Sequence, residues 1–137
     1  MGTTIRPETS KKNVYWLDKH RHYELRHFCL QYPIWKKEYS MIEGLNRPSI
    51  ERVGSSGMIS NPTAISAELK VYYADRMKMV EDAAVSTNHE LARFIFTAVT
   101  EGVSYDHLKA RLDIPCGKDA YYKLYRRFFW LLSKARN

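Results

Sequence analysis

Cationic side chains gather near the C-terminal end of the sequence, with an aromatic residue among them. Lys118, Lys123, Arg126 and Arg127 fall within one short stretch, which also contains Tyr122. Lysine and arginine bind phosphate oxygens, and arginine can also donate to base edges. At about 100° per residue, Tyr122, Lys123 and Arg126 share one face of a helix, and the other two cations flank it. These residue types and this spacing predict a surface that binds a polyanion.

An apolar stripe is predicted on the opposite side of the same helix. It consists of Tyr121, Leu124, Phe128, Leu131 and Leu132. Residues 103–137 hold eight Lys or Arg against three Asp, a net charge of +5. A basic helix face is often only a solvated surface. Here the charge, the amphipathic registry and a preceding tight turn coincide, and this coincidence favours DNA binding.

Two helices and a tight turn are expected to position this surface. Helical patterns cover residues 104–112 and 118–135, and residues 113–117 between them include a proline and a glycine that interrupt the pattern. Asp113, at the start of the turn, tolerates a left-handed backbone. Two helices joined so closely have to cross, which predicts a helix-turn-helix. In that motif the second helix enters the major groove of DNA.

Local signals support the boundary of the first of these helices. Ser104 can cap it by accepting a backbone N–H with its side-chain oxygen, and Gly102 suits the end of the helix before it. Leu108 and Leu112 have the spacing of residues that face inward. These signals agree with the position of the turn.

A helix over residues 87–101 is expected to complete a three-helix unit. Ser86 or Thr87 is expected to cap this helix, and the run from Thr87 to Glu90 has the form of a capping box, in which Glu90 returns a hydrogen bond to the cap. Its buried side is predicted to consist of Leu91, Phe94, Ile95 and Ala98. Three helices are the minimum that holds a recognition helix rigidly.

Three histidines and a cysteine near the N-terminus raise the question of a metal site. They are His20, His22, His27 and Cys29. Ligands that share a metal on one helix lie three or four residues apart, whereas His20 and His22 are two apart and diverge. We therefore expect a solvated or partly packed helix, with no metal and no cofactor. Cys116 has no CxxC partner, so both cysteines are expected to be reduced thiols.

The composition is that of a basic globular protein. The formal net charge is +7 and the pI about 9.4, which favours polyanionic partners. No run of eighteen apolar residues occurs, so we expect no membrane partner and a cytoplasmic location. No carboxylate pair, phosphate-binding glycine loop or spacing of nucleophile and base stands out, so no enzyme is predicted.

The pattern along the chain predicts an all-α fold in four segments. They are a flexible arm (1–14), an N-terminal helical segment (15–44), a linker (45–61) and a long helix followed by the helix-turn-helix DNA-binding domain (62–137). In the N-terminal segment we expect a helical pair, the first helix over residues 16–32 and the second ending at Glu43 before Gly44. Because the linker is long and rich in Gly, Ser and Pro, the helical pair is expected to move relative to the C-terminal segment.

The long central helix, entered at Asn61-Pro62, carries a narrow apolar seam. The seam consists of Ile65, Leu69, Tyr73, Met77, Val80 and Ala84. A narrow seam suits pairing with another long helix, either in the same chain or in a second copy. Residues 49–102 have five basic and seven acidic residues, a net charge of −2, which favours a scaffold or oligomerisation element over a DNA surface. We expect a homo-oligomer, with a dimer favoured.

The layout resembles small transcriptional regulators of Gram-positive phages, the RinA and ArpU kind of late-gene activator. The resemblance lies in Tyr32-Pro33-Ile34-Trp35-Lys36-Lys37, in the linker, in Asn61-Pro62-Thr63-Ala64 at the entry to the long helix, and in Tyr122-Lys123-Leu124-Tyr125-Arg126-Arg127-Phe128-Phe129. It implies a sigma-factor-like helix-turn-helix at the C-terminus and control of phage or prophage genes.

The sequence therefore predicts a transcription regulator that binds specific double-stranded DNA. The candidate DNA-binding residues are Ser104, Lys118, Tyr122, Lys123, Arg126 and Arg127. Host RNA polymerase is a further candidate partner. Two alternatives stay open: a small terminase-type DNA-packaging protein, and a phage protein that binds a host protein, such as RNA polymerase or a defence nuclease, through Trp130, Phe129 and the aromatic N-terminal helices.

Overall fold

The computed structural model describes residues 12–45 and 62–137, which form six α-helices and no β-strand. The helices are α1 (Lys19–Leu30), α2 (Tyr32–Leu45), α3 (Pro62–Thr87), α4 (Ala92–Glu101), α5 (Tyr105–Leu112) and α6 (Lys118–Ala135). The all-α class is confirmed. The predicted flexible arm, apart from its last three residues, and the predicted linker, apart from its first residue, lie outside the described residues.

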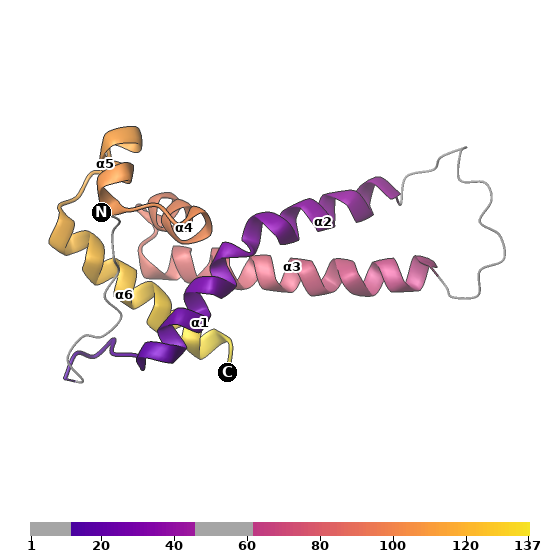
Figure 1. Cartoon of the computed structure of the whole chain (residues 1–137), viewed down its shortest axis with the longest axis horizontal. Coiled ribbons are helices and arrows are strands. Elements are labelled where there is room, and N and C mark those ends of the chain that lie inside the picture. The colour runs from indigo at the N-terminus through magenta and orange to yellow at the C-terminus, as the bar shows by residue number, and fades with distance from the viewer. Residues whose placement is uncertain (1–11, 46–61) are drawn as a thin grey trace.

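Helix α2 and the N-terminal half of α3 extend away from the part of the molecule that contains α1, α4, α5 and α6 (Figure 1). Figure 1 shows α2 and the N-terminal half of α3 side by side and antiparallel, while α4 and α6 pack against the rest of α3, α1 packs against α4 and α6, and α5 packs against α4. A single residue, Gln31, separates α1 from α2, and its carbonyl oxygen accepts the backbone N–H groups of Ile34 and Trp35. Pro33 is tolerated there because the first turn of a helix has no use for its missing N–H. We call the paired part of α2 and α3 the arm. It is distinct from residues 1–14, which the sequence predicted to be a flexible N-terminal arm.

One hydrophobic core joins the N-terminal helices to the rest. Leu25 and Cys29 of α1 are fully buried, and they belong to the same cluster as Val80 of α3, Ile95 of α4 and Phe128 of α6. Trp35 of α2 also lies in this cluster. The N-terminal helical segment therefore shares its core with the long helix and with the C-terminal helices.

The predicted seam of α3 packs mostly within the chain. Val80 and Ala84 are buried in the core, and Tyr73 and Met77 pack against it. Only the outer pair, Ile65 and Leu69, is exposed. Most of this seam is therefore covered by helices of the same chain.

Three sequence-based expectations about helix ends need correction. Gly44 does not end the second helix, because α2 continues through it to Leu45. Thr87 does not begin the fourth helix; it lies in the last turn of α3, where its hydroxyl donates to the carbonyl of Ala83 at 2.7 Å. The capping oxygen comes instead from Asn88, whose side chain accepts the N–H groups of Glu90 and Leu91, each at 2.9 Å.

Candidate nucleic-acid interface

The turn between α5 and α6 is fixed by contacts that a sequence pattern only partly predicts. Asp113 has the expected left-handed backbone, with φ of 53°. Ile114 then inserts into the core and is fully buried, whereas Leu112, predicted to face inward, is 41% exposed. Tyr105 donates its hydroxyl to the carbonyl of Cys116 at 2.7 Å and thereby ties the start of α5 to the end of the turn.

The inner face of α6 is wider than the predicted stripe. Tyr121, Phe128 and Leu132 are buried as expected, and Tyr125 and Phe129, which the prediction left out, are buried as well. Leu124 and Leu131 lie only half-buried at the margins. The stripe widens because α6 packs against α3 on one side and α1 on the other, where the ring of Phe129 lies 4.8 Å from that of His22. This packing fixes the rotation of α6 about its own axis.

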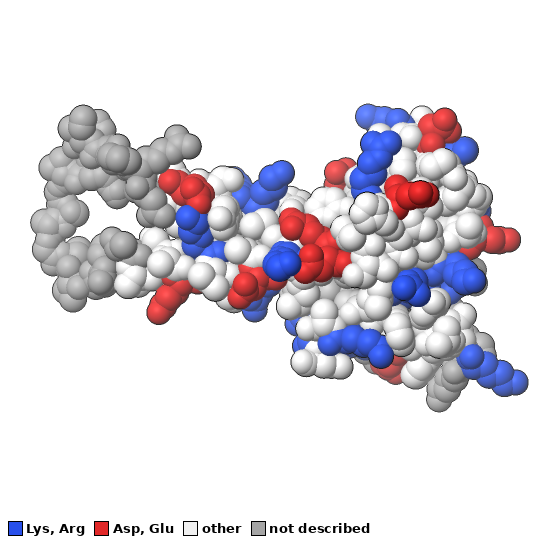
Figure 2. Space-filling view, turned by 180° about the vertical axis from the view of Figure 1, so that it is seen from behind, with Lys and Arg blue, Asp and Glu red and all other residues white. Residues whose placement is uncertain are grey.

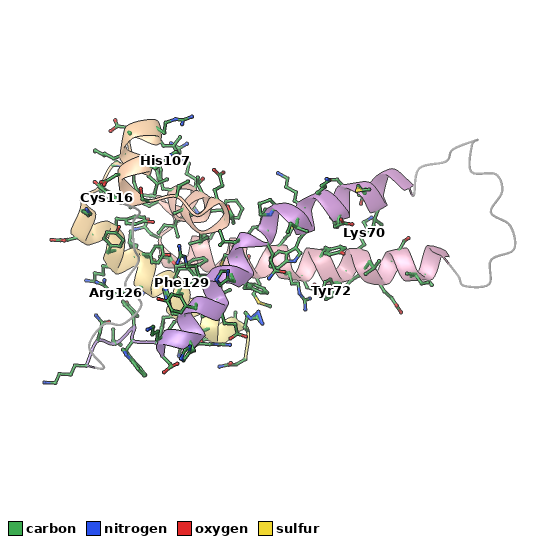
Figure 3. The ribbon with its side chains drawn as sticks, in the orientation of Figure 1. Lys70, Tyr72, His107, Cys116, Arg126 and Phe129 are labelled. Carbon is green, nitrogen blue, oxygen red and sulfur yellow. The ribbon has the colours of Figure 1, made fainter. Side chains whose placement is uncertain are left out.

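The outer face of α6 carries the predicted cations and one aromatic ring. Lys118 and Lys123 are exposed, and Tyr122 and Arg126 are half-buried. None of these cations forms an ion pair with another residue that the structure describes. Figure 3 shows Arg126 on the outer side of α6, whereas Phe129 points from α6 toward α1. The charged groups are therefore available to a partner.

Arg126 differs from the two lysines because part of its guanidinium is desolvated. Its Nε atom is buried and has no hydrogen-bond acceptor within the described residues. A buried donor without an acceptor costs free energy, more so when it carries charge. The Nε atoms of Arg127 and Arg136 are buried in the same way, so a ligand would have to bind the terminal nitrogens of Arg126 rather than its Nε.

Arg127, the next residue, is used inside the protein. Its Nη1 donates to the hydroxyl of Tyr15 at 3.1 Å, and its Nη2 donates to the backbone carbonyl of Ser86 at 3.4 Å. The ring of Tyr15 also packs on that of Trp130, with centroids 5.4 Å apart. Arg127 therefore connects α6 to the segment before α1 and to the end of α3, and it is less available to a ligand than Arg126.

Ser104 and Tyr122 can both act as neutral donors. Ser104 Oγ caps α5 by accepting the N–H of His107 at 3.1 Å, so its own hydroxyl hydrogen can still be donated. Burial, together with the negative charge of Asp106, raises the pKa of Tyr122. Its phenol therefore keeps its proton at neutral pH and can donate to a phosphate or a base.

One exposed cation was missed by the sequence analysis. Arg111 lies in the last turn of α5 and is exposed. Lys109 of the same turn is less free, because its Nζ donates to the carbonyl of Ile114 at 3.2 Å and lies 3.4 Å from a carboxylate oxygen of Asp113. The sequence could have indicated Arg111, because it lies in the last turn of the short helix that leads into the turn before α6.

Charge is distributed differently over the two parts of the molecule. On the face of the arm seen in Figure 2, acidic and basic side chains are interleaved. The segment that contains α5 and α6 has the excess of eight Lys or Arg over three Asp. A polyanion would therefore be attracted to the α5–α6 end rather than to the arm.

The residues weighed as metal ligands lie apart from this face. His22 and Cys29 are buried, and burial raises the pKa of the Cys29 thiol. Within residues 12–45 and 62–137 no group of three or more His, Cys, Asp or Glu side chains could hold a metal ion. No helix in these ranges is long and apolar enough to span a membrane.

No protein-family model, curated protein or solved structure matches this chain.

Proposed function

We propose that the protein is a transcription regulator that binds specific double-stranded DNA, and that α5, the turn and α6 act as its helix-turn-helix. The observation that carries the proposal is the two-sided character of α6. One face packs against other helices. The other presents Lys118, Tyr122, Lys123 and Arg126, and none of its three cations pairs with an acidic side chain of residues 12–45 or 62–137. A rigid helix with an unpaired basic outer face meets the requirements of a recognition helix.

Each side chain has a role that follows from its position. Lys118 and Lys123, with Arg111 of α5, bind phosphates, because they are exposed and flexible. Arg126 and Tyr122 lie closer to the helix surface and contact base edges, together with Lys123. Ser104 donates its hydroxyl to a phosphate at the start of α5.

The resemblance to RinA and ArpU regulators extends the proposal to the control of phage or prophage late genes. It also makes host RNA polymerase a candidate partner once DNA is bound. The cytoplasm of the bacterial host is where such a regulator would act. This part of the proposal rests on the sequence patterns alone.

The decisive experiment selects bound fragments from random and phage duplex DNA, followed by fluorescence anisotropy with the selected duplex. We expect one preferred sequence and a Kd that rises with salt. With the three phosphate contacts of Lys118, Lys123 and Arg111, the log–log slope of the binding constant against salt would be about −3 for each bound protomer. No preferred sequence together with a flat salt response would exclude the proposal.

The terminase-type alternative is tested by mass. A packaging protein of that class assembles into a ring, so gel filtration coupled to light scattering would report many subunits rather than one or two. A large closed ring would replace the regulator proposal by the packaging one.

The alternative that the chain binds a host protein through Trp130 and Phe129 has less support. Phe129 is buried, and Trp130 lies between Tyr15 and Lys134, whose Nζ is 4.1 Å from the ring centroid. These rings therefore form no open aromatic patch. A pull-down from nuclease-treated host lysate would still reveal a protein-mediated contact.

A further inference from the structure

The arm exposes large apolar side chains that no other described helix covers. Its members are Ile34 and Met41 of α2, with Ile65, Leu69 and Tyr72 of α3. Each is between 41% and 59% exposed. Single exposed apolar residues are common on protein surfaces, whereas a contiguous group usually marks an interface. The first question is whether these five form a group.

The helical registry places all five on one broad side of the arm. Four of them lie one residue before a position that faces the partner helix or its stripe: Ile34 precedes buried Trp35, Met41 precedes buried Ile42, Tyr72 precedes Tyr73, and Leu69 precedes Lys70, which pairs with Glu43 of α2. Ile65 lies one helical turn before Leu69 on the same side. One residue is a turn of about 100° about the helix axis. Two antiparallel helices are related by a two-fold axis perpendicular to the plane of the pair, so the same offset on both helices points to the same side. We call this side the apolar face of the arm.

Contacts around Tyr72 agree with this registry. Figure 3 shows Lys70 between α2 and α3, where it pairs with Glu43, and Tyr72 on the side of α3 away from α2. The guanidinium carbon of Arg76 lies 3.6 Å from the centre of the Tyr72 ring, and the ring of Tyr73 is 5.3 Å away. Tyr72 is therefore held in place although almost half of its surface is open.

The α3 part of the face continues a stripe that already packs against a helix. Residues 65, 69, 72, 76, 79 and 83 follow the alternating four-and-three spacing of helix-packing seams. At the inner end of this stripe, Met79 and Ala83 line a hollow together with Leu131 and Ala135 of α6. At the outer end, Ile65, Leu69 and Tyr72 have no described helix opposite them. The stripe is a helix-packing surface that is filled for only half of its length.

We infer that the apolar face of the arm binds the same face of a second copy of this chain, so that two arms form a four-helix bundle. The charges on the two edges of the face favour this occupant. Exposed Lys37 lies on the outer edge of α2, and exposed Glu68 and Asp75 lie on the outer edge of α3. If the two-fold axis runs along the arms, α2 of each copy faces α3 of the other, and basic edges meet acidic edges.

The pairing within one arm sets the register of these charges. Glu43 pairs with Lys70, and Tyr32 donates to Glu81. A residue of α2 and the residue of α3 opposite it along the arm therefore have residue numbers that sum to about 113. Lys37 therefore lies at nearly the height of Asp75. With the axis along the arms, Lys37 of one copy meets Asp75 of the second copy. With the axis across the arms, α2 would face α2 of the second copy, so the two basic edges would meet each other.

The expected interface is of modest size. The 14 residues of α2 span about 21 Å, and two helices are roughly 20 Å wide, so the pair of faces buries about 840 Å² in total. Interfaces of this size are typical of reversible association. We therefore expect monomer and dimer to exchange as the protein concentration is varied.

Sedimentation velocity of the full chain without DNA, from about 1 to 100 µM, tests the inference. The wild type should shift from monomer to dimer across this range. Leu69→Glu places a charge in the middle of the face and should weaken the dimer at least tenfold. Val71→Glu is the matched control: Val71 is 58% exposed on the same helix but lies off the face, so its dimer should stay within about twofold of wild type. Thermal melts by circular dichroism would show that both variants fold.

Charge reversal tests the arrangement. Lys37→Glu and Asp75→Lys should each weaken the dimer, and the double variant should restore it. A wild type that stays monomeric at all concentrations, or a dimer that survives Leu69→Glu, would overturn the inference. Failure of the double variant to recover would overturn the two-fold axis along the arms. The surface uses α2 and α3, so none of these outcomes bears on DNA binding by α6.

Discussion

Arg126 and Arg127 form a matched pair that tests the assignment of the DNA-binding face. They are neighbours on α6 and carry the same charge, so replacing either by alanine changes the net charge by the same amount. Their surroundings differ. The Nε of each is buried without an acceptor in the described part of the chain, but the Nη atoms of Arg127 donate to Tyr15 and to the carbonyl of Ser86, whereas Arg126 forms no hydrogen bond of this kind with the described residues.

The two variants should therefore fail in different ways. Arg127→Ala removes two hydrogen bonds from a charged donor at a partly exposed site, and we expect a loss of about 1–2 kcal/mol of unfolding free energy. Arg126→Ala removes a poorly satisfied donor, and its stability should stay within about 0.5 kcal/mol of wild type. For DNA the order reverses. Loss of a base contact at Arg126 should cost about 1–3 kcal/mol, roughly 5- to 150-fold in Kd.

Urea unfolding and fluorescence anisotropy on the selected duplex provide the two measurements. For Arg127→Ala, only long-range attraction is lost, so Kd should rise less than about fivefold, and by less as salt is added. Anisotropy must be measured well below the melting temperature so that unfolding does not mimic lost binding. The reasoning is refuted if Arg127→Ala weakens DNA binding as much as Arg126→Ala, or if Arg126→Ala is the less stable of the two.

Three further predictions concern the core behind this face. Tyr121→Ala should lower the unfolding free energy by about 3–5 kcal/mol, because Tyr121 is almost fully buried between Tyr105 and Tyr125, and chemical unfolding measures it. A thiol reagent should modify half-exposed Cys116 in the native protein but reach buried Cys29 only after denaturant is added, and Cys116→Ser would remove the first phase. Burial raises the pKa of Cys29 and of Tyr121. Because both pKa values are higher in the folded than in the unfolded protein, the contribution of these groups to the unfolding free energy should be fully present below about pH 8. It should fall as the pH rises past about 8.5, where the unfolded thiol ionises, and again past about 10, where the unfolded phenol ionises. Unfolding curves at several pH values would show this loss.

Much of the α5–α6 region could be predicted because its signals are local. Ser104 accepts the N–H of His107, Gly102 and Asp113 have positive φ, and the observed bounds of α6, Lys118–Ala135, are the predicted ones. Capping and turn formation depend on a few neighbouring residues, so a sequence pattern contains them. Thr87 shows the limit of such patterns. Its hydroxyl can either cap the next helix or donate to a carbonyl of the helix that precedes it. Because α3 continues through Thr87, the hydroxyl donates to the carbonyl of Ala83.

The difference between Arg126 and Arg127 could not be predicted from local pattern. The partner hydroxyl of Arg127 is 112 residues away in the sequence, and its carbonyl partner is 41 residues away. The same holds for Tyr125 and Phe129, which are buried because α1 covers a side of α6 that a single apolar stripe would leave open. Burial on a helix follows the number of helices packed against it, and that number is a property of the whole fold.

The N-terminal segment gains a role from these long-range contacts. Arg21 of α1 donates from Nε to the hydroxyl of Ser133 and from Nη2 to its carbonyl, each at 3.0 Å, and Phe129 packs on His22. Tyr15 holds Arg127 and Trp130 from the same side. Phe129 lies on the inner side of α6. Arg127, Trp130 and Ser133 follow Lys123 and Arg126 by one or two helical turns on the same side, so these N-terminal contacts flank the cations. A recognition helix discriminates between bases only if its rotation is fixed, because a turn of one residue moves every side chain by about 100°. If α6 binds DNA as proposed, the segment before α2 contributes to recognition by holding α6 in register.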